Sequence, residues 1–298
     1  MKTIVIVGAA GQLGQYLVEV FQGSRLDVNI VSLARQEMDL SDSSVIESVL
    51  ADKAADLIIN ASAYTAVDKA ESEPELAMQI NATAPAIMAK FASAHNIPLI
   101  HYSTDYVFAG DHSSPYQTDF PTNPQGEYGR TKLAGEQKIL TSESQAYIFR
   151  TAWVYSNKGG NFYKTMLRLA ESRDELSIVN DQIGSPTYAF SIAKASLEVV
   201  RQLLDCNSIE RMQDKYPSGI YHMTSEGQTS WADFAREIFR LHDLSVNVTG
   251  IPTSEFPTPA KRPAYSVLDN QTLYDVFEIK MPDWKLALSE CFEEKTDY

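Results

Sequence analysis

The stretch Thr3-Ile4-Val5-Ile6-Val7-Gly8-Ala9-Ala10-Gly11-Gln12-Leu13-Gly14 decides the fold of this chain. Its first five residues are β-branched, which is typical of a strand, and we expect a helix to begin near Gln12. Gly8 allows the tight turn, Gly11 leaves backbone N–H groups open to a phosphate, and Gly14 lets the helix pack closely on the strand. Two residues separate each glycine from the next, unlike the Gly-x-Gly-x-x-Gly fingerprint, so a tight turn without a ligand is the alternative interpretation.

The composition is that of a soluble globular protein. The chain has 298 residues, of which 44% are hydrophobic and 21% charged, and its formal net charge is −14. An acidic balance argues against a nucleic-acid or anionic-membrane partner, since either would need a basic face. The two cysteines, Cys206 and Cys291, match neither a metal-binding nor a disulfide spacing, and no apolar run is long enough to span a membrane. We therefore expect a cytoplasmic protein with no metal site.

Apolar strands alternate with helices over the first half. We expect strands at Thr3–Val7, Val28–Leu33, Asp56–Ala61, Pro98–Ser103 and Ala146–Thr151, and helices at Gln12–Phe21, Ser43–Leu50, Pro74–Ala94 and Glu127–Leu140. Ser41 is the expected cap of the second helix. This alternation predicts an α/β fold with a Rossmann-like, doubly wound parallel sheet.

The second half is less regular. We expect helices at Phe162–Glu171, Phe190–Leu204 and Trp231–Leu241, and strands at Leu176–Val179, Gly219–Met223 and Val246–Gly250. Residues 1–151 are interpreted as a dinucleotide-binding domain. Residues 152–298 are interpreted mainly as a smaller α/β substrate-binding lobe that is interleaved with the first domain, and residues 293–298 as a solvated tail.

Tyr128-Gly129-Arg130-Thr131-Lys132 is the strongest chemical motif. Residues four apart share one face of a helix, so the phenol of Tyr128 and the ammonium of Lys132 point to the same place. A nearby cation favours the phenolate, and Lys132 is therefore expected to lower the pKa of Tyr128 toward a value suited to proton transfer. The alternative interpretation is that Tyr128 and Lys132 are exposed on a solvated helix and have no chemical role.

Ser103-Thr104-Asp105-Tyr106 ends the fourth expected strand. Ligands bind at the carboxyl ends of strands in an open parallel sheet, so Thr104 is placed to donate a hydrogen bond to a substrate oxygen and Asp105 to act beside it. Taken alone, such a stretch is more often a cap or turn. His101, which lies just before it, is interpreted as a packing or surface residue, as are His222 and His242.

Longer stretches resemble one enzyme family. The glycine-rich turn, the strand-end Thr and Tyr-x-x-x-Lys together resemble the extended short-chain dehydrogenases/reductases, and more specific strings are similar to the dTDP-4-dehydrorhamnose reductases among them. These strings are Ala63-Tyr64-Thr65-Ala66-Val67-Asp68-Lys69-Ala70-Glu71, Ser103-Thr104-Asp105-Tyr106-Val107-Phe108, Arg150-Thr151-Ala152-Trp153-Val154-Tyr155-Ser156, Asp181-Gln182-Ile183-Gly184-Ser185-Pro186-Thr187, Gly219-Ile220-Tyr221-His222 and Ser230-Trp231.

The resemblance implies an NADPH- or NADH-dependent oxidoreductase of polysaccharide biosynthesis. The implied reaction reduces the 4-keto group of the nucleotide sugar dTDP-4-dehydro-6-deoxy-L-mannose to give dTDP-L-rhamnose. Tyr128 would donate the proton, Lys132 would hold the nicotinamide ribose and lower the phenol pKa, and Thr104 would polarise the carbonyl. The implied substrate contacts are Thr104, Asp105, Tyr128 and Trp153, and Arg262 is a candidate partner for the substrate pyrophosphate.

The resemblance also implies a set of cofactor contacts. Arg35 stands where an acid that binds the ribose 2′-hydroxyl is usual and can meet a 2′-phosphate, so NADPH is expected to be accepted at least as well as NADH; a plain surface charge is the alternative. The full expected cofactor set is Gly8, Ala10, Gly11, Gln12, Leu13, Gly14, Arg35, Asp39, Leu40, Ala61, Ala63, Tyr64, Thr65, Tyr102, Tyr128 and Lys132. Some relatives hold magnesium between carboxylates at a dimer contact. Gln15 is uncharged where one such carboxylate is expected, so a homodimer here would form without a bridging metal.

Three alternative functions share these features. A nucleotide-sugar 4,6-dehydratase carries Thr-Asp-Glu after the fourth strand, whereas this chain has Tyr106 in place of the Glu. A 4-epimerase shares the Tyr/Lys pair but retains a tightly held NAD. The regulatory subunit of methionine adenosyltransferase is a non-catalytic NADP-binding relative in which loss of the Tyr or the Lys would be expected, and here both are present.

Overall fold

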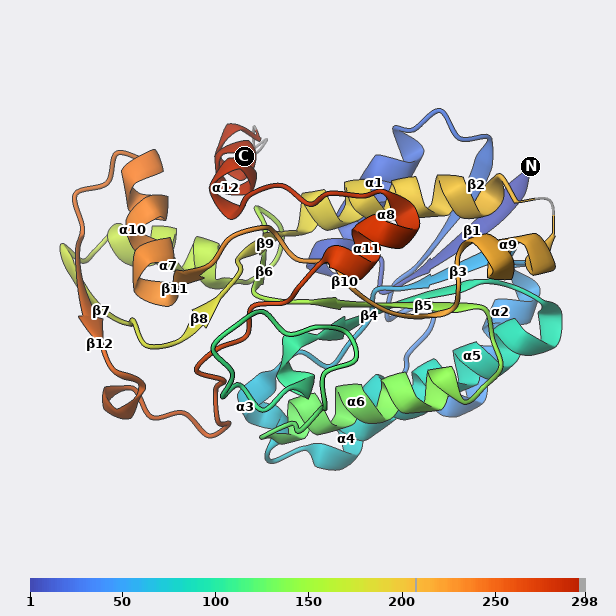
Figure 1. The fold of residues 1–298 in the computed structure, drawn as a ribbon, viewed down its shortest axis with the longest axis horizontal. Helices are drawn as coiled ribbons and strands as arrows, with labels where there is room; N and C mark the ends of the chain where they lie inside the picture. Colours follow the sequence, from blue (N-terminus) through green and yellow to red (C-terminus); the bar gives the residue numbers. More distant parts are fainter. Residues whose placement is uncertain (207, 295–298) are drawn as a thin grey trace.

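A six-stranded parallel sheet forms the centre of the protein (Figure 1). The computed structural model describes residues 1–206 and 208–294. The strand order is β2-β1-β3-β4-β5-β10, and every neighbouring pair is parallel. The strands are β1 (Lys2–Val7), β2 (Val28–Leu33), β3 (Leu57–Asn60), β4 (Leu99–Thr104), β5 (Ala146–Thr151) and β10 (Gly219–His222). This confirms the predicted Rossmann-like doubly wound sheet.

Helices cover both faces of this sheet (Figure 1). On one side lie α1 (Gln12–Gln22) and α8 (Ala189–Leu204), and on the other lie α2 (Ile46–Asp52), α5 (Ala84–His95) and α6 (Glu127–Leu140). Alternate side chains of β1 serve the two cores: Ile4 and Ile6 pack with α1 and α8, whereas Val5 and Val7 pack toward α2 and α5. Strands buried on both faces explain the continuous apolar runs in the sequence.

The helix expected at Pro74–Ala94 is not continuous. It consists of α4 (Pro74–Met78), a π-helical turn at Gln79–Thr83 and α5. The side chain of Asn81, in that turn, accepts a hydrogen bond from the backbone N–H of Tyr64 and donates one to the Tyr64 carbonyl. The wider turn therefore aims a buried amide at the chain that follows β3, a tertiary demand that helix periodicity does not reveal.

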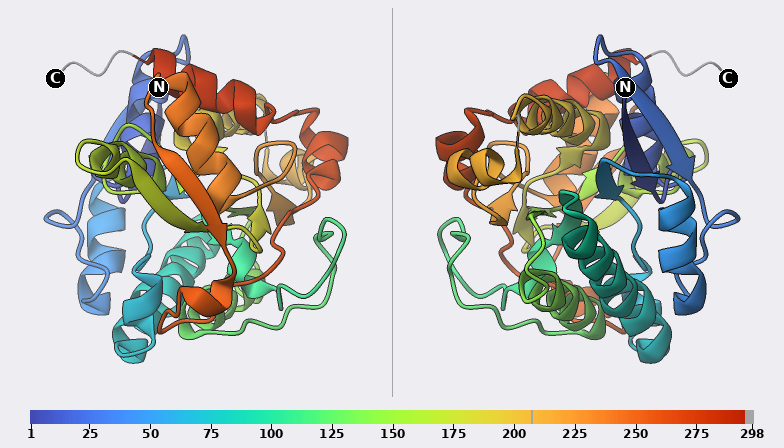
Figure 2. Two further views of the ribbon diagram at one scale, coloured as in Figure 1. Left: turned by 90° about the vertical axis from the view of Figure 1, so that its left-hand side faces the viewer. Right: turned by 90° about the vertical axis from the view of Figure 1, so that its right-hand side faces the viewer.

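The second half combines small sheets with helices. Its two-stranded sheets pair β7 (Glu175–Val179) with β12 (Asn247–Ile251), β6 (Val154–Tyr155) with β9 (Thr187–Tyr188), and β8 (Ile183–Gly184) with β11 (Thr229–Ser230). Figure 2 shows β7 and β12 side by side, apart from the main sheet. The accompanying helices are α7 (Phe162–Ala170), α9 (Ile209–Lys215), α10 (Trp231–Leu241), α11 (Gln271–Phe277) and α12 (Trp284–Glu293).

Parts of the second half lie within the first. β10 pairs with β5 at the edge of the main sheet, and α8 packs against α1. Short elements fill out the connections, namely α3 (Val67–Ala70) and the 3-10 turns η1 (Ser43–Val45), η3 (Asp105–Val107) and η4 (Thr253–Glu255). The boundary at residue 151 stays a prediction.

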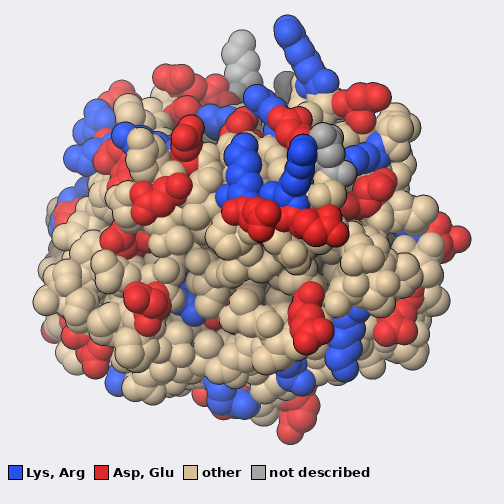
Figure 3. Space-filling view, turned by 45° about the vertical axis from the view of Figure 1, so that its right-hand side comes forward, with Lys and Arg blue, Asp and Glu red and all other residues tan. Residues whose placement is uncertain are grey.

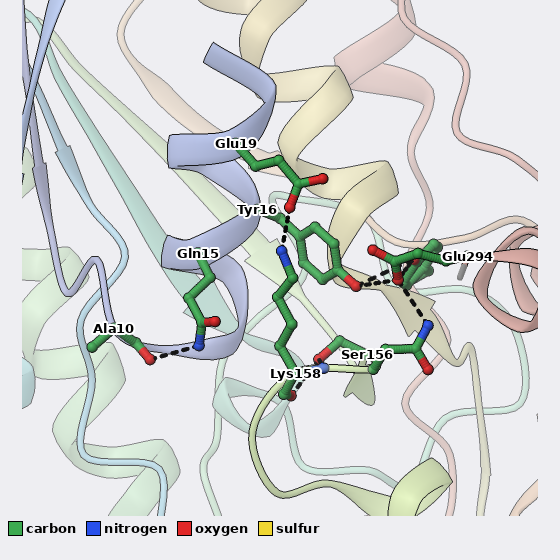
Figure 4. A network of polar contacts seen from close by, with 9 residues as sticks. Ala10, Gln15, Tyr16, Glu19, Ser156, Lys158 and Glu294 are labelled. Carbon is green, nitrogen blue, oxygen red and sulfur yellow. Dashed lines mark hydrogen bonds and ion pairs between the residues drawn. The ribbon is translucent and has the colours of Figure 1, made fainter. Parts of the chain in front are cut away.

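Two local expectations are wrong. Asp42, not Ser41, caps η1, because its carboxylate accepts from the Ser44 N–H. Glu294 does not lie in a solvated tail: its carboxylate accepts hydrogen bonds from the hydroxyls of Tyr16 and Tyr188 (Figure 4). Buried phenols need an acceptor, and the end of the chain supplies it. The rest of the expected tail, residues 295–298, lies outside the described residues.

The glycine-rich turn holds β1 and α1 in close contact. A Cβ atom on Gly14 would lie 2.1 Å from the carbonyl oxygen of Gly8, which is backbone and cannot rotate away. A Cβ on Gly8, whose φ is +81°, would lie 2.7 Å from the Ser62 nitrogen. Both positions therefore require glycine, as predicted, because of helix packing at Gly14 and the turn conformation at Gly8.

We expect Gly14→Ala to lower the free energy of unfolding by about 2–3 kcal/mol, because the added methyl group forces α1 away from β1. Gly160→Ala is the matched control, since no described heavy atom lies within 4 Å of its added Cβ, and the change should stay within about 0.5 kcal/mol. Urea unfolding followed by circular dichroism measures both. Equal effects from the two variants would contradict the packing role of Gly14.

Candidate active site

The predicted phosphate-binding turn lies where the chain connections of the sheet diverge. β1 and β3 are neighbours in the sheet, and the connections that leave them run to opposite faces, through α1 after β1 and through α4 and α5 after β3; ligands bind at such a point. Among the described residues no side chain caps α1, and its first turn holds no acidic residue. Gly11 and Ala10 are exposed there. A helix N-terminus without a side-chain cap or a competing carboxylate fits a bound pyrophosphate.

Side chains around this turn fix its shape. Gln15 donates to the Ala10 carbonyl at 2.9 Å (Figure 4), and the Gln12 amide oxygen accepts from Ser156 and Asn161. Leu13 is buried in the core with Tyr16. The segment after β6 thus holds Gln12 beside the turn, a contact that the sequence did not indicate.

The other predicted cofactor residues lie after β2 and β3. Arg35 has a side chain 78% exposed that pairs only loosely with Asp39, 3.2 Å from its nitrogen to the carboxylate. Hydrogen bonds from Ser41 lower the pKa of Asp39. The side chain of Leu40 is packed in the core. Along the chain after β3, Ala61, Ala63 and Tyr64 are partly buried and Thr65 is exposed.

Lys132 is buried against the sheet. Tyr128, Lys132 and Glu136 follow one another at four-residue intervals on α6. The Lys132 side chain is 1% exposed, donates to the backbone carbonyl of Tyr102 at 2.7 Å and lies 3.2 Å from Nε2 of His101. Burial lowers the pKa of Lys132 to about 8, and the nearby Glu136 opposes this shift. The predicted motif therefore faces the protein interior and not bulk solvent.

The predicted direction of the Tyr128 pKa is wrong in this structure. Burial raises the pKa of Tyr128 to about 12, with a hydrogen bond involving Thr104 opposing the rise and the charge of Asp105 adding to it. Lys132 donates its hydrogen bond to the Tyr102 carbonyl, and desolvation of the phenolate is the largest cause of the raised pKa of Tyr128. Tyr128 is therefore held as a neutral phenol, which is the proton-donor form.

Thr104 and Asp105 lie together beside Tyr128. The Thr104 hydroxyl donates to the Asp105 carboxylate at 3.0 Å and accepts from the N–H of Tyr106. Asp105 is 2% exposed, and burial raises its pKa to about 6, against the hydrogen bond from Thr104. A continuous set of polar groups thus runs from the phenol of Tyr128 through Thr104 to a buried carboxyl.

The two remaining predicted substrate residues are already engaged. The Trp153 indole stacks on Trp231, with ring centroids 3.5 Å apart and planes 4° apart, and Gly184 lies against its ring atoms. Arg262 donates to Asp68 at 2.8 Å and lies beside the Tyr106 ring that packs on Tyr128. Trp153 therefore has one face covered, and Arg262 reaches the first half of the chain. Tyr102 contributes its carbonyl here, because its own hydroxyl is bonded to Ser196 in the core.

Sequence reasoning missed several buried polar groups at this site. Arg150 and Glu136 form a bidentate ion pair at 3.0 and 2.7 Å, with both side chains at most 2% exposed. Asn81 links Tyr64 to Thr131 on α6, and His101 meets Lys132. The sequence did allow the position of Glu136 to be predicted, because this residue continues the four-residue spacing of Tyr128 and Lys132. His101 carried no local signal beyond its position two residues before the end of a buried strand.

Comparison with known proteins shows the family of this chain. The RmlD substrate binding domain family matches residues 1–296. The chain belongs to this family. The dTDP-4-dehydrorhamnose reductase of Burkholderia thailandensis is 40% identical over 98% of each chain, and that of Salmonella typhimurium is 38% identical over 98% of this chain and 97% of its own.

Solved structures of the same kind superpose closely. The dTDP-4-dehydrorhamnose reductase of Clostridium acetobutylicum has a TM-score of 0.88 and 39% identity, covering 98% of both chains. The Bacillus anthracis enzyme, solved in complex with NADP, has a TM-score of 0.89 and 35% identity, covering 99% of this chain and 100% of its own. The whole chain therefore shares the RmlD-family fold, and a close structural relative binds NADP.

The described surface and interior also bear on partners. In the described parts of the chain, no group of three or more His, Cys, Asp and Glu side chains is arranged to hold a metal ion. Of the described helices, none is long and apolar enough to cross a membrane. On the face shown in Figure 3, the described Lys and Arg side chains lie among Asp and Glu and form no continuous basic area.

We expect Asp105→Asn to stabilise the protein at about pH 8 by roughly 1–3 kcal/mol. The folded state raises the pKa of Asp105, so the ionised carboxyl opposes folding above about pH 6, and this penalty disappears as the pH falls toward the unfolded pKa. The advantage of the variant should therefore shrink below pH 6. Chemical unfolding at several pH values measures it.

Asp42→Asn is the matched control. Hydrogen bonds from Ser44 lower the pKa of Asp42, so its ionised form favours folding at neutral pH. That variant should not stabilise the protein at pH 8. If Asp105→Asn is destabilising at pH 8 and the loss grows with pH, the buried ionised carboxyl described above is incorrect.

Proposed function

We propose that this chain reduces the 4-keto group of dTDP-4-dehydro-6-deoxy-L-mannose to give dTDP-L-rhamnose, using NADPH or NADH. The observation that supports the proposal is that Tyr128, Thr104 and the buried Lys132 lie at the carboxyl end of β4. The turn at Gly11 follows the carboxyl end of β1 and so lies at the same end of the parallel sheet. Full-length relatives carry the name of this reductase. When bound, the reduced nicotinamide supplies the hydride for the ketone carbon.

Tyr128 supplies the proton in this proposal. Reduction of a ketone leaves negative charge on its oxygen, and an acid within hydrogen-bond distance neutralises that charge. Tyr128 is protonated in the folded protein because burial raises its pKa. The ammonium of Lys132, one turn along the same face of α6, then stabilises the phenolate that proton donation leaves behind.

Thr104 and Asp105 orient the carbonyl. The Thr104 hydroxyl accepts from the Tyr106 N–H and is hydrogen bonded to Asp105, so its position at the strand end is fixed by two partners. The Tyr106 N–H keeps the Thr104 oxygen in place while the hydroxyl proton turns from Asp105 to the ketone oxygen. Asp105 acts by holding Thr104 and by facing the sugar hydroxyls from a buried position.

Trp153 and Arg262 complete the substrate site in this proposal. The Trp153 indole is partly exposed and stacks on Trp231, and an indole suits the apolar face of a deoxy sugar. The guanidinium of Arg262 suits the substrate pyrophosphate, which would compete with Asp68 for it. The positive charge of Arg262 would attract a dianionic substrate locally, although the net charge of the chain is −14.

The alternative chemistries are less well supported. Tyr106, where a dehydratase carries its Glu, packs edge-to-face on Tyr128 with ring centroids 5.5 Å apart, so no carboxylate stands there to run an elimination. A non-catalytic binding subunit does not need the proton donor Tyr128 or the buried Lys132 four residues after it. Location in the cytoplasm and a metal-independent homodimer stay predictions.

We expect Tyr128→Phe to lower kcat about 10³-fold while NADPH binding is unchanged, because only the proton donor is removed. Tyr106→Phe is the matched control, since it removes a neighbouring phenol of the same site and should cost less than about 10-fold. Loss of NADPH absorbance with the keto-sugar measures turnover, and fluorescence titration measures binding. Full activity of the Tyr128 variant would overturn its role as the acid.

Arg35→Ala should lower kcat/KM for NADPH at least about 10-fold and leave that for NADH within about twofold, because a 2′-phosphate contact is worth one or two charge-assisted hydrogen bonds. The side chain of Arg35 is exposed, so we expect the variant to fold normally, and its melting temperature checks this. An equal loss with both cofactors would refute a 2′-phosphate role.

A further inference from the structure

A row of buried side chains leads from Lys132 back to the glycine-rich turn. Nζ of Lys132 lies 3.2 Å from Nε2 of His101, and Nδ1 of His101 lies 3.0 Å from Nδ2 of Asn60. His101 is 0% and Asn60 1% exposed. Asn60 is the last residue of β3, and Ser62, two residues on, faces Gly8 of the turn.

The orientation of the Asn60 amide follows from its neighbours. Its oxygen accepts the backbone N–H of Ser62 at 3.1 Å and also the Ser62 hydroxyl. A backbone N–H can only donate, so the amide oxygen must face Ser62 and the NH₂ group must face His101. Nδ1 of His101 therefore accepts, and the neutral imidazole carries its proton on Nε2.

This arrangement has a consequence for Lys132. An Nε2–H group points at the lysine nitrogen, which must offer a lone pair to accept it, and only the neutral amine has one. An ammonium would instead need Nε2 as an acceptor, which places a proton on Nδ1 against the Asn60 NH₂. Flipping the Asn60 amide would relieve that clash, but the backbone N–H of Ser62 would then lose its acceptor.

We propose that His101 is a positioning residue for Lys132, held by Asn60 as the Nε2–H tautomer so that it favours the neutral amine over the ammonium. This inference deepens the proposed function, on which it rests for its kinetic part. His101 is buried and contacts Lys132; by opposing protonation of the lysine, it sets the pH above which the ammonium that supports the Tyr128 phenolate is lost. Protonation of Lys132 therefore requires a change in the hydrogen bonds of His101, Asn60 and Ser62, and Ser62 lies next to Gly8 of the turn.

Other charges around Lys132 act differently. Glu136 on α6 favours the ammonium, but its carboxylate is already paired with Arg150 on β5. Asp105 on η3 faces Tyr128, and Tyr128 itself is neutral. Burial lowers the pKa of His101 well below its usual value, so the imidazole does not add a positive charge. The tautomer of His101 is thus the adjustable contact of the lysine.

The first test measures the tautomer in the free, full-length protein. In protein labelled with ¹⁵N at its five histidines, two-bond nitrogen–proton correlation spectra report which ring nitrogen carries the proton, and His101→Gln assigns the signal. We expect Nε2–H for His101 above about pH 8, and Nδ1–H in Asn60→Asp, whose added carboxylate oxygen accepts at that position. An Nδ1–H form in the unaltered protein at high pH would overturn the proposal.

The second test measures the consequence for Lys132. His101→Gln can turn its amide oxygen toward the ammonium, so the basic limb of kcat/KM against pH should move up by roughly one pH unit. His222→Gln is the matched control, because it alters another buried histidine whose ring bonds to the Asp269 carbonyl and not to Lys132. An unmoved limb in His101→Gln, or an equal shift in both variants, would overturn the proposal.

The two tests separate this inference from the proposed reaction. If the unaltered protein oxidises no NADPH with the keto-sugar at any pH, the proposed function fails, while the tautomer spectra still decide the role of His101. If His101→Gln does not fold, the spectra of the unaltered protein and of Asn60→Asp decide it.

Discussion

Burial of Lys132 is the constraint on which the site depends. An amine that is 1% exposed must find its hydrogen bonds inside the protein, and it finds them on β4, at the carbonyl of Tyr102 and the ring of His101. Those contacts fix α6 over the sheet edge. They therefore also fix Tyr128, one helical turn earlier, beside Thr104. The position of Tyr128 thus follows from the hydrogen bonds that the buried Lys132 requires.

The sheet and the site were predictable to different degrees. The alternation of apolar strands with helices predicted the parallel sheet, and four-residue spacing placed Tyr128 and Lys132 on one face. The π-helical turn at Asn81 was not predictable, because it answers the backbone of Tyr64, which is distant in sequence. The pKa direction of Tyr128 was missed because spacing reveals a neighbouring charge but not the loss of water around it.

Long-range polar contacts join the two halves of the chain around this site. Asp68 on α3 accepts from Arg262 and from the Ala260 N–H, and Glu294 accepts from Tyr16 on α1. Each joins residues about 190 or more positions apart, a separation at which sequence patterns carry no information. The segment that carries Arg262 is thus held against the half that carries Tyr128, which leaves that guanidinium close to the proposed reaction.

The most direct measurement is a crystal structure of the protein with NADP⁺ and dTDP-L-rhamnose bound. The account predicts that the Tyr128 hydroxyl lies within hydrogen-bond distance of the sugar O4, with the nicotinamide on the other side of that carbon and Lys132 still buried behind the phenol. A sugar O4 beyond the reach of Tyr128, or Lys132 turned into solvent, would contradict it.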